Sequence, residues 1–431
     1  MTMRRQLPAV DSLAEALAAL RALPANVDED TQFTVPLRQA PDPLRWIAAQ
    51  PSGQRLFWSD RDGQQIAGWG FAAEASTAEL TAIRLDRRPW IGGLAFDETG
   101  AIDDAWETFG RGSFWLPALA LAVTPDHRRL LLHRTPGDGV DLSAVTAEVA
   151  SSGVRFVCET FQTLPARDDW IENVEDALQA FGSGFLDKVV LSRQIRLALT
   201  AAPNPFQVLM RLREAQQETF NFCFETTAGR AFLGCSPELL LWRQGATLTS
   251  EALAGTRPRG ETPEADAALA RSLLESAKDR REHDHVVAAI GRVLSAQSAA
   301  VTRPDVPQVR AHHRVQHLWT PFTATLRPTA LDPVLVGGLH PTPAVCGQPR
   351  PRALGFIRAH EPFSRGWYAG AVGRAGEGSL TLAVGIRSAL VVDAELWVCA
   401  GAGLVEGSDP EAEWDELDSK SAQFFALMEA P

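Results

Sequence analysis

Cysteine is scarce in this sequence, and its few cysteines form no recognisable pattern. The 431 residues include Cys158, Cys223, Cys235, Cys346 and Cys399, and none of these belongs to a CxxC pair. An odd number of widely spaced cysteines argues against a disulfide framework and against a zinc ribbon. We therefore expect reduced thiols and a cytoplasmic protein.

Long hydrophobic runs are also missing. The longest, WLPALALAV at 115–123, is too short to span a bilayer. The N-terminal segment MTMRRQLPAVDSLAEALAAL carries Asp11 and Glu15 in its apolar stretch, so we interpret it as an amphipathic helix and not as a secretory signal. We expect no association with a membrane.

Positive charge is in deficit. The chain has 41 Lys and Arg against 53 Asp and Glu, a formal net charge of −12. Because nucleic acids and anionic membranes bind clustered cations, this balance argues against both as partners. Hydrophobic residues at 45% and charged residues at 22% are ordinary for a chain with a large core, and they exclude a disordered or collagen-like chain. An anionic substrate would need a locally positive site.

The pattern of apolar residues predicts one large α+β unit. Short apolar runs such as RLFWS, WIGGLAF and LALAV, separated by Pro and Gly, predict a strand-rich N-terminal layer over residues 1–160. The remainder, 161–431, mixes both element types and has no Gly/Ser linker. We predict helices at 42–50, 168–180, 203–215, 263–297 and from Asp409, and strands at 188–199, 220–226, 247–256 and 314–326.

Four acidic residues are spaced so that two pairs share helix faces. Asp279 and Glu282 are three residues apart in KDRREHDH, and Glu413 and Glu416 repeat the spacing in GSDPEAEWDELDSK. Residues three apart have Cβ atoms about 5–6 Å from each other, so two such helices could together hold a hard divalent ion such as Mg²⁺. The alternative is a solvated acidic face on each helix.

A glycine-rich segment precedes the last predicted helix. In VCAGAGLVEGSDPEAEW, Gly401 and Gly403 leave backbone N–H groups accessible to an anion such as a carboxylate, and Ser408 or Asp409 can cap the helix. The segment has no Lys-Ser/Thr of a P-loop, and Gly407 falls one residue late for GxGxxG. The structural alternative is a strand-to-helix turn that requires positive φ.

Several ionisable residues stand among apolar neighbours. Lys188 opens KVVLSR and Glu238 lies in GCSPELLLW. Burial lowers the pKa of a lysine and raises that of a glutamate, so the two could serve as base and acid; a structural ion pair or solvated strand ends are the alternatives. Arg387, within the predicted β segment AVGIRSALV, needs an anionic partner if buried. His317 in RVQHLW is, by pattern alone, a core or surface histidine.

Taken in order, these segments resemble the chorismate-binding enzyme family. The resemblance covers residues 160–431 and rests on KVVLSR, FLGCSPELL, EALAGTRPRG, KDRREHDHV, VQHL, HPTPAVCG, GWYAGAVG, VGIRSA and GAGLVEGSDPEAEWDELDSK. It implies a large α/β sandwich of antiparallel sheets with surrounding helices, and a cleft that binds Mg²⁺ beside chorismate.

The resemblance also implies residue roles. Lys188 would be the general base that activates a water for attack at C2 of chorismate, and Glu238 the general acid that protonates the departing C4 hydroxyl. The implied Mg²⁺ ligands are Glu282 and Glu416, with Asp279, where the family usually has Glu, and Glu413 in supporting or water-mediated roles. Lys420 and the N–H groups of Gly401 and Gly403 would hold the ring carboxylate, Arg387 the enolpyruvyl carboxylate, and Thr256, His317 and Ala344 would lie near the substrate.

Three positions distinguish the branches of the family. Anthranilate synthases carry Gln where this chain has Lys188, aminodeoxychorismate synthases a nucleophilic Lys at Ala254, and salicylate synthases usually Thr at Ala344. The resemblance therefore implies an isochorismate synthase without an amidotransferase subunit, serving menaquinone or siderophore synthesis, and the long segment before Lys188 is more similar to the menaquinone branch. The alternatives are a salicylate synthase with pyruvate-lyase activity and a non-catalytic chorismate-binding regulatory protein.

Overall fold

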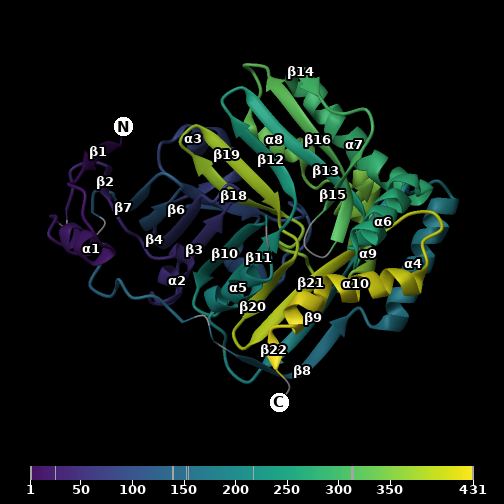
Figure 1. Cartoon of the computed structure of the whole chain (residues 1–431), viewed down its shortest axis with the longest axis horizontal. Helices are drawn as coiled ribbons and strands as arrows, with labels where there is room; N and C mark the ends of the chain where they lie inside the picture. Colours follow the sequence, from purple (N-terminus) through teal and green to yellow (C-terminus); the bar gives the residue numbers. More distant parts are fainter. Residues whose placement is uncertain are drawn as a thin grey trace.

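The computed structural model describes residues 2–24, 26–137, 140–151, 153, 155–216, 218–311 and 315–429. Its strands form an extended, mainly antiparallel sheet system with helices packed around it (Figure 1). Among the described strands, only β1–β2 and β8–β22 pair in parallel. This is the α+β architecture that the sequence predicts.

One half of the sheet system carries the glycine-rich segment. Its strands pair in the order β8 (Phe156–Leu164), β9 (Lys188–Leu199), β21 (Glu395–Leu404), β20 (Ser388–Val392), β11 (Arg230–Ser236), β10 (Phe220–Thr227), β3 (Arg55–Ser59) and β4 (Gln65–Ser76). The short strands β17 (Gly347–Gln348) and β22 (Met428–Glu429) join β9 and β8.

The other half carries the segment EALAGTRPRG. It runs through β5 (Trp90–Leu94), β18 (Ala371–Gly376), β19 (Ser379–Val384), β12 (Leu239–Gln244), β13 (Thr247–Pro258) and β16 (Val315–Leu326), with β14 (Ser298–Thr302) and β15 (Gln308–Ala311) beside β16. The long strand β6 (Gly112–Val123) joins the halves, since it pairs with β4 along one edge and with β5 and β7 (Arg128–Arg134) along the other. Beyond β7, the sheet continues through β2 (Thr31–Pro36) and β1 (Met3–Gln6).

The helices largely follow the sequence prediction. They are α1 (Leu13–Arg21), α2 (Pro43–Ala48), α3 (Leu80–Leu85), α4 (Arg167–Gly182), α5 (Pro205–Glu214), α6 (Pro263–Glu275), α7 (Ala277–Gln297), α8 (Asp332–Leu339), α9 (Arg350–His360) and α10 (Pro410–Phe425), with 3₁₀ turns at Thr77–Glu79 and Asp104–Phe109. Asp409 caps α10 by accepting from the Ala412 N–H at 2.9 Å, and Pro410 occupies its first turn. The predicted start of this helix is confirmed.

The prediction of a single helix over 263–297 is wrong, because the helix is interrupted at Ser276. This residue has ψ of 112°, outside the helical region, and its hydroxyl accepts from the Asp279 N–H at 3.2 Å, so it caps α7. Serine competes well for such cap positions because its oxygen satisfies an otherwise unpaired N–H at the helix start. The break places Asp279 in the first turn of α7 and Glu282 one turn later.

The N-terminal residues share both sheet and core with the rest of the chain. Strand β3 pairs with β10, and β5 pairs with β18. Trp106 packs edge-on against Phe232, with ring centroids 5.2 Å apart, in a core cluster that also contains Trp58 and Trp367. The boundary predicted at residue 160 falls inside β8. The assignment of residues 1–160 to an N-terminal layer and of 161–431 to the catalytic region stays a prediction.

The predicted strand 314–326 corresponds to β16, and residue 314 lies outside the described residues. Within the part of the chain that the structure describes, no helix is long and apolar enough to cross a membrane.

Candidate active site

One cavity, of about 310 Å³, brings together residues that the sequence singled out from distant segments. Every predicted site residue except Lys188 lines it, and Lys188 bonds to the lining residue Glu282. The predicted residues in the lining are Glu238, Thr256, Asp279, Glu282, His317, Ala344, Arg387, Gly401, Gly403, Glu413, Glu416 and Lys420. The cavity lies between the helix pair α7 and α10 and the strands β13 and β21.

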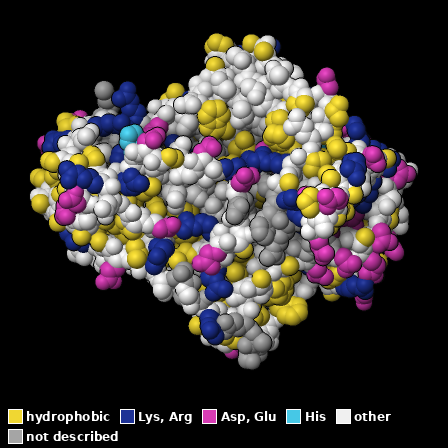
Figure 2. All heavy atoms as spheres, in the orientation of Figure 1, with side chains coloured by type: hydrophobic (Ala, Val, Ile, Leu, Met, Phe, Trp, Pro, Cys, Tyr) yellow, Lys and Arg dark blue, Asp and Glu magenta, His cyan; other side chains and the backbone are white. Residues whose placement is uncertain are grey.

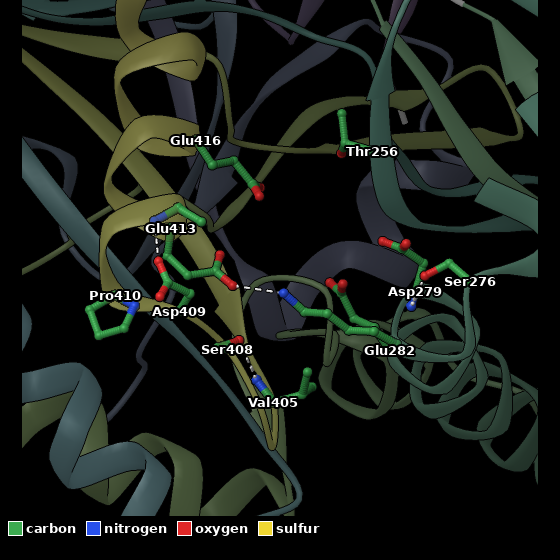
Figure 3. A network of polar contacts seen from close by, with 12 residues as sticks. Thr256, Ser276, Asp279, Glu282, Val405, Ser408, Asp409, Pro410, Glu413 and Glu416 are labelled. Atoms are coloured by element: carbon green, nitrogen blue, oxygen red, sulfur yellow. Dashed lines mark hydrogen bonds and ion pairs between the residues drawn. The ribbon is translucent and has the colours of Figure 1, made fainter. Parts of the chain in front are cut away.

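The four acidic residues converge, as their spacing allowed but did not establish. Figure 3 shows Asp279 and Glu282 on α7 directed toward the same space as Glu413 and Glu416 on α10. The alternative of two separate solvated acidic faces is therefore wrong for these four side chains.

Each of the four carboxylates has a basic partner from this chain. The pairs are Arg257–Asp279 at 2.7 Å, Lys188–Glu282 at 2.9 Å, Lys278–Glu413 at 3.0 Å and Lys420–Glu416 at 2.6 Å. Burial raises the pKa of Glu413, and the Lys278 charge offsets this only in part. The Lys420 ammonium, in contrast, lowers the pKa of Glu416. The site thus carries paired charges and no unbalanced acidic cluster.

The donor set can be tested against a divalent ion. Among the described residues, no group of three or more His, Cys, Asp or Glu stands at metal-binding spacing. Mg²⁺ does not require such a group, since it usually takes one or two protein carboxylates and fills its other positions with water and substrate oxygens. Glu282 and Glu416 offer hard oxygen donors from the two sides of one space, so the chemistry of the donor set fits Mg²⁺.

The candidate base and acid are both buried. Lys188 begins β9, is completely buried, and donates from Nζ to Glu282 Oε1 at 2.9 Å. Glu238 lies in the link between β11 and β12. Its burial, together with the charge of Glu251, raises the pKa of Glu238 to about 8. Glu238 therefore holds its proton at neutral pH.

Arg387 differs from its sequence interpretation. It lies between β19 and β20 with φ of 52°, so it belongs to a left-handed turn and not to a β run. It is directed to the cavity, and its Nη1 donates to the Lys420 carbonyl oxygen at 3.0 Å. Lys420 Nζ in turn donates to the Gly401 carbonyl oxygen at 2.7 Å. A guanidinium and an ammonium thus flank the same part of the cavity.

The two glycines of GAGLV are needed for space and not for a turn. Both lie in β21 opposite β9, and neither has positive φ; Gly407 has it instead, at 84°. A Cβ on Gly403 would lie 2.8 Å from Glu282 Oε1, and one on Gly401 would lie 3.0 Å from the Tyr368 hydroxyl oxygen. The positive-φ alternative is wrong at these two positions, and a Cβ at either one would crowd the neighbouring side chain.

Thr256 and His317 face each other across the β13–β16 pair at the cavity wall. Thr256 Oγ1 lies 3.1 Å from His317 Nδ1, which is also 3.1 Å from the Gly255 carbonyl oxygen. His317 is therefore neither a core nor a free surface residue.

Comparison with known proteins explains this convergence. The profile of a family described as "Chorismate binding enzyme" matches residues 84–429. The chain belongs to the chorismate-binding enzyme family. The match begins well before residue 160, so this enzyme family's pattern includes β5 and β6, which the motif-based resemblance left out.

Several similar members of this family are isochorismate synthases. The chain is 32% identical to isochorismate synthase MenF of Bacillus subtilis, over 88% of this chain and 89% of that one. It is 36% identical to a salicylate biosynthesis isochorismate synthase of Pseudomonas aeruginosa, over 86% and 78%. The solved structure of the menaquinone-specific MenF of Escherichia coli superposes with a TM-score of 0.86, at 29% identity, covering 96% of this chain and 99% of that one. The predicted family and fold are confirmed.

Three lining residues of this chorismate-binding enzyme were missed by the sequence interpretation. Lys278 and Arg257 pair with Glu413 and Asp279, and Tyr368 approaches Gly401. Each stands within a family segment already quoted, KDRREHDHV, EALAGTRPRG or GWYAGAVG. Lys278 and Arg257 stand beside the selected residues Asp279 and Thr256, whereas Tyr368 has no selected neighbour, and the partners of all three lie on other elements.

Proposed function

We propose that this protein is a Mg²⁺-dependent isochorismate synthase that converts chorismate to isochorismate. The observation that carries the proposal is a cavity lined by a buried, protonated glutamate, four carboxylates and four cationic side chains, with a buried lysine bonded to one of those carboxylates. Moving a hydroxyl from C4 to C2 requires a base for the entering water and an acid for the departing hydroxyl. The family membership and the isochorismate synthase relatives support the same conclusion.

We assign the two catalytic roles to these two buried side chains. Lys188, in its neutral amine form, accepts a proton from the water that attacks C2, and Glu238 donates its proton to the hydroxyl that leaves C4. Burial suits Glu238 to this task because it keeps a carboxylic acid neutral near pH 7. Gln at position 188, as in anthranilate synthases, could not accept this proton.

The substrate carboxylates meet the positive groups of the cavity. Arg387 holds the enolpyruvyl carboxylate, while Lys420 and the backbone N–H groups of Gly401 and Gly403 hold the ring carboxylate. Thr256, His317 and Ala344 border the ring. A site of this kind supplies local positive charge inside a protein of net negative charge.

We assign Mg²⁺ to Glu282 and Glu416, with Asp279 and Glu413 in supporting positions. When bound, the ion would neutralise the ring carboxylate and favour loss of the C4 hydroxyl. Glu282 and Glu416 contact Lys188 and Lys420 through Oε1, so the second oxygen of each carboxylate would be the one to hold the ion.

Two alanines and the length of the chain support the assignment within the family. Ala254 leaves no nucleophilic lysine for an aminodeoxychorismate synthase, and Ala344 stands where salicylate synthases usually have Thr. Similarity to the menaquinone-specific MenF along almost its whole length supports menaquinone synthesis as the pathway served.

Product analysis tests the function. Purified protein is incubated with chorismate and Mg²⁺, and the products are separated by chromatography. Isochorismate in equilibrium with chorismate is the expected result. Salicylate with pyruvate as main products would contradict the assignment, and no turnover by a folded protein would favour the regulatory alternative.

The pH dependence of the reaction provides a second prediction. Because the pKa of Glu238 is raised to about 8, the acid is protonated below that pH and loses its proton above it. We expect kcat to fall as the pH rises through about 8, by up to about tenfold per unit. The measurement is kcat at saturating chorismate and Mg²⁺ from pH 6 to 10. A rate that keeps rising to pH 10 would exclude Glu238 as the acid.

A further inference from the structure

An arginine from the N-terminal region reaches the peptide groups beside Glu238. Arg61 stands in the turn between β3 and β4 and donates from Nη2 to the Pro237 carbonyl oxygen. The same nitrogen pairs with Glu251 Oε1 at 2.7 Å. Its guanidinium also lies over the Phe220 ring, 4.5 Å from the centroid, which fixes the orientation of the side chain. The side chain is thus held at three points.

Glu251, the partner of Arg61, is a buried carboxylate with several donors. It lies on β13 and accepts from the Leu239 N–H at 2.9 Å, from Arg310 at 2.7 Å and from Trp319 Nε1 at 3.1 Å. Burial opposes the ionisation of Glu251, but the charges of Arg61 and Arg310 outweigh this and lower its pKa. Glu251 is therefore ionised at neutral pH.

Together the two residues hold both peptide groups that flank Glu238. Arg61 holds the carbonyl of Pro237, and Glu251 holds the N–H of Leu239. The N–H of Glu238 itself donates to Ser236 Oγ at 3.2 Å, and its carbonyl oxygen accepts from a backbone N–H of β19. The backbone at Glu238 has little freedom, so the direction of its side chain into the cavity is fixed.

We infer that Arg61 and Glu251 are a positioning pair for the acid Glu238, whose side chain they aim at the substrate. The inference rests on the proposed function, in which Glu238 donates a proton. Arg61 lies in the N-terminal region, far in sequence from the catalytic motifs. The inference therefore assigns this region a role in positioning the acid.

The charges around Glu238 decide the sign of the expected effects. Glu251 on β13 disfavours loss of the proton, and after burial it is the largest cause of the raised pKa. Lys188 on β9, Arg61 in the β3–β4 turn and Lys420 on α10 act in the opposite direction. Removing Glu251 and removing Arg61 should therefore shift the titration of Glu238 in opposite directions.

The first test replaces Arg61. Arg61→Met should lower kcat about 10- to 100-fold, since a small misplacement of a catalytic group has effects of that size, while KM for chorismate changes less than about threefold. It should also move the alkaline limb of the kcat profile to higher pH. Arg61→Lys keeps the charge but lacks the planar guanidinium that lies over the Phe220 ring, so we expect it to restore the limb and only part of kcat.

The second test replaces Glu251. Glu251→Gln keeps the shape and one acceptor oxygen but removes the charge, so the alkaline limb should move to lower pH by about one unit. Opposite shifts of the alkaline limb in the two variants distinguish positioning and tuning of the acid from a general loss of stability. A general loss of stability would leave the alkaline limb of each variant at the wild-type pH.

The matched control is a second buried ion pair, whose arginine lies on β3, the strand that leads into the turn of Arg61. Arg55 on β3 pairs with Glu225 on β10 at 2.5 Å, with side chains only 4% and 3% exposed, and neither residue lines the candidate active site. Arg55→Met and Glu225→Gln should lower the thermal unfolding temperature but keep the alkaline limb, and, for the folded fraction, kcat within about twofold.

The outcomes separate this inference from the function itself. The products of the wild type decide the proposed function, whereas the ratio of variant to wild-type rates decides the role of the pair. An alkaline limb at the wild-type pH in both Arg61→Met and Glu251→Gln would overturn the inference. So would losses of kcat no greater than in the Arg55 and Glu225 controls.

Discussion

Replacing Lys188 with Ala should lower kcat for chorismate conversion by about 10²- to 10⁴-fold, the range that a general base contributes. The completely buried Nζ of Lys188 has its contact with Glu282 at the cavity edge, and no other described residue has been assigned to activate the water. Steady-state kinetics with chromatographic detection of isochorismate measures the loss.

Lys188→Gln is the matched variant for this experiment. It retains polarity and most of the side-chain length, but its amide accepts no proton at neutral pH, so it should lose as much activity as Lys188→Ala. Thermal unfolding of both variants shows whether each is folded, since each leaves Glu282 without its contact to Lys188 Nζ. Substantial turnover by either folded variant would refute the assignment of the base.

The sequence predicted most elements because local signals agreed with the tertiary structure. The helix from Asp409 had a capping side chain and a proline at its first turn, and both occur in α10. The break at Ser276 was missed because Ala, Leu, Glu and Arg continue on both sides, although Ser276 and Asp279 have the spacing of a helix-capping signal. Arg387 likewise has a positive φ although it is not a glycine, so its residue type did not indicate the turn.

The candidate site was predictable where the relevant spacing is local. The i, i+3 acids on α7 and α10 share helix faces by geometry alone, whereas their facing one another is a property of the fold. The partners Lys278 and Arg257, and the contact of Arg61 with Glu251, join residues on different elements. Gly403 was selected as an anion-binding residue, but its need to be glycine became clear only once Glu282 was placed beside it.

The net charge of −12 also has a structural interpretation. Many acidic residues lie on outer helix faces, and Figure 2 shows acidic side chains gathered over the region of α4. The exposed acids of α4 are Asp168, Asp169, Glu172, Glu175 and Asp176. These charges are separate from the cavity, where each acid is paired with a cation, so the overall balance does not determine the sign of the substrate.

Glu416→Ala should raise the Mg²⁺ concentration for half-maximal activity at least about tenfold and weaken direct Mg²⁺ binding to the same degree. Glu416 is one of only two carboxylates assigned as direct ligands, and water cannot replace its negative charge. Titration calorimetry with Mg²⁺, in the presence and absence of chorismate, measures binding independently of turnover.

The control lies five residues earlier on the same helix. Glu411 is also on α10, but it pairs with Arg167 at the surface and does not line the cavity, so Glu411→Ala should leave Mg²⁺ binding unchanged. Removing Glu416 also frees Lys420, which no longer has a carboxylate four residues away on its helix. If the freed ammonium alone caused the loss, KM for chorismate would change while Mg²⁺ affinity stayed the same. That result, or wild-type Mg²⁺ affinity in Glu416→Ala, would remove Glu416 from the metal site.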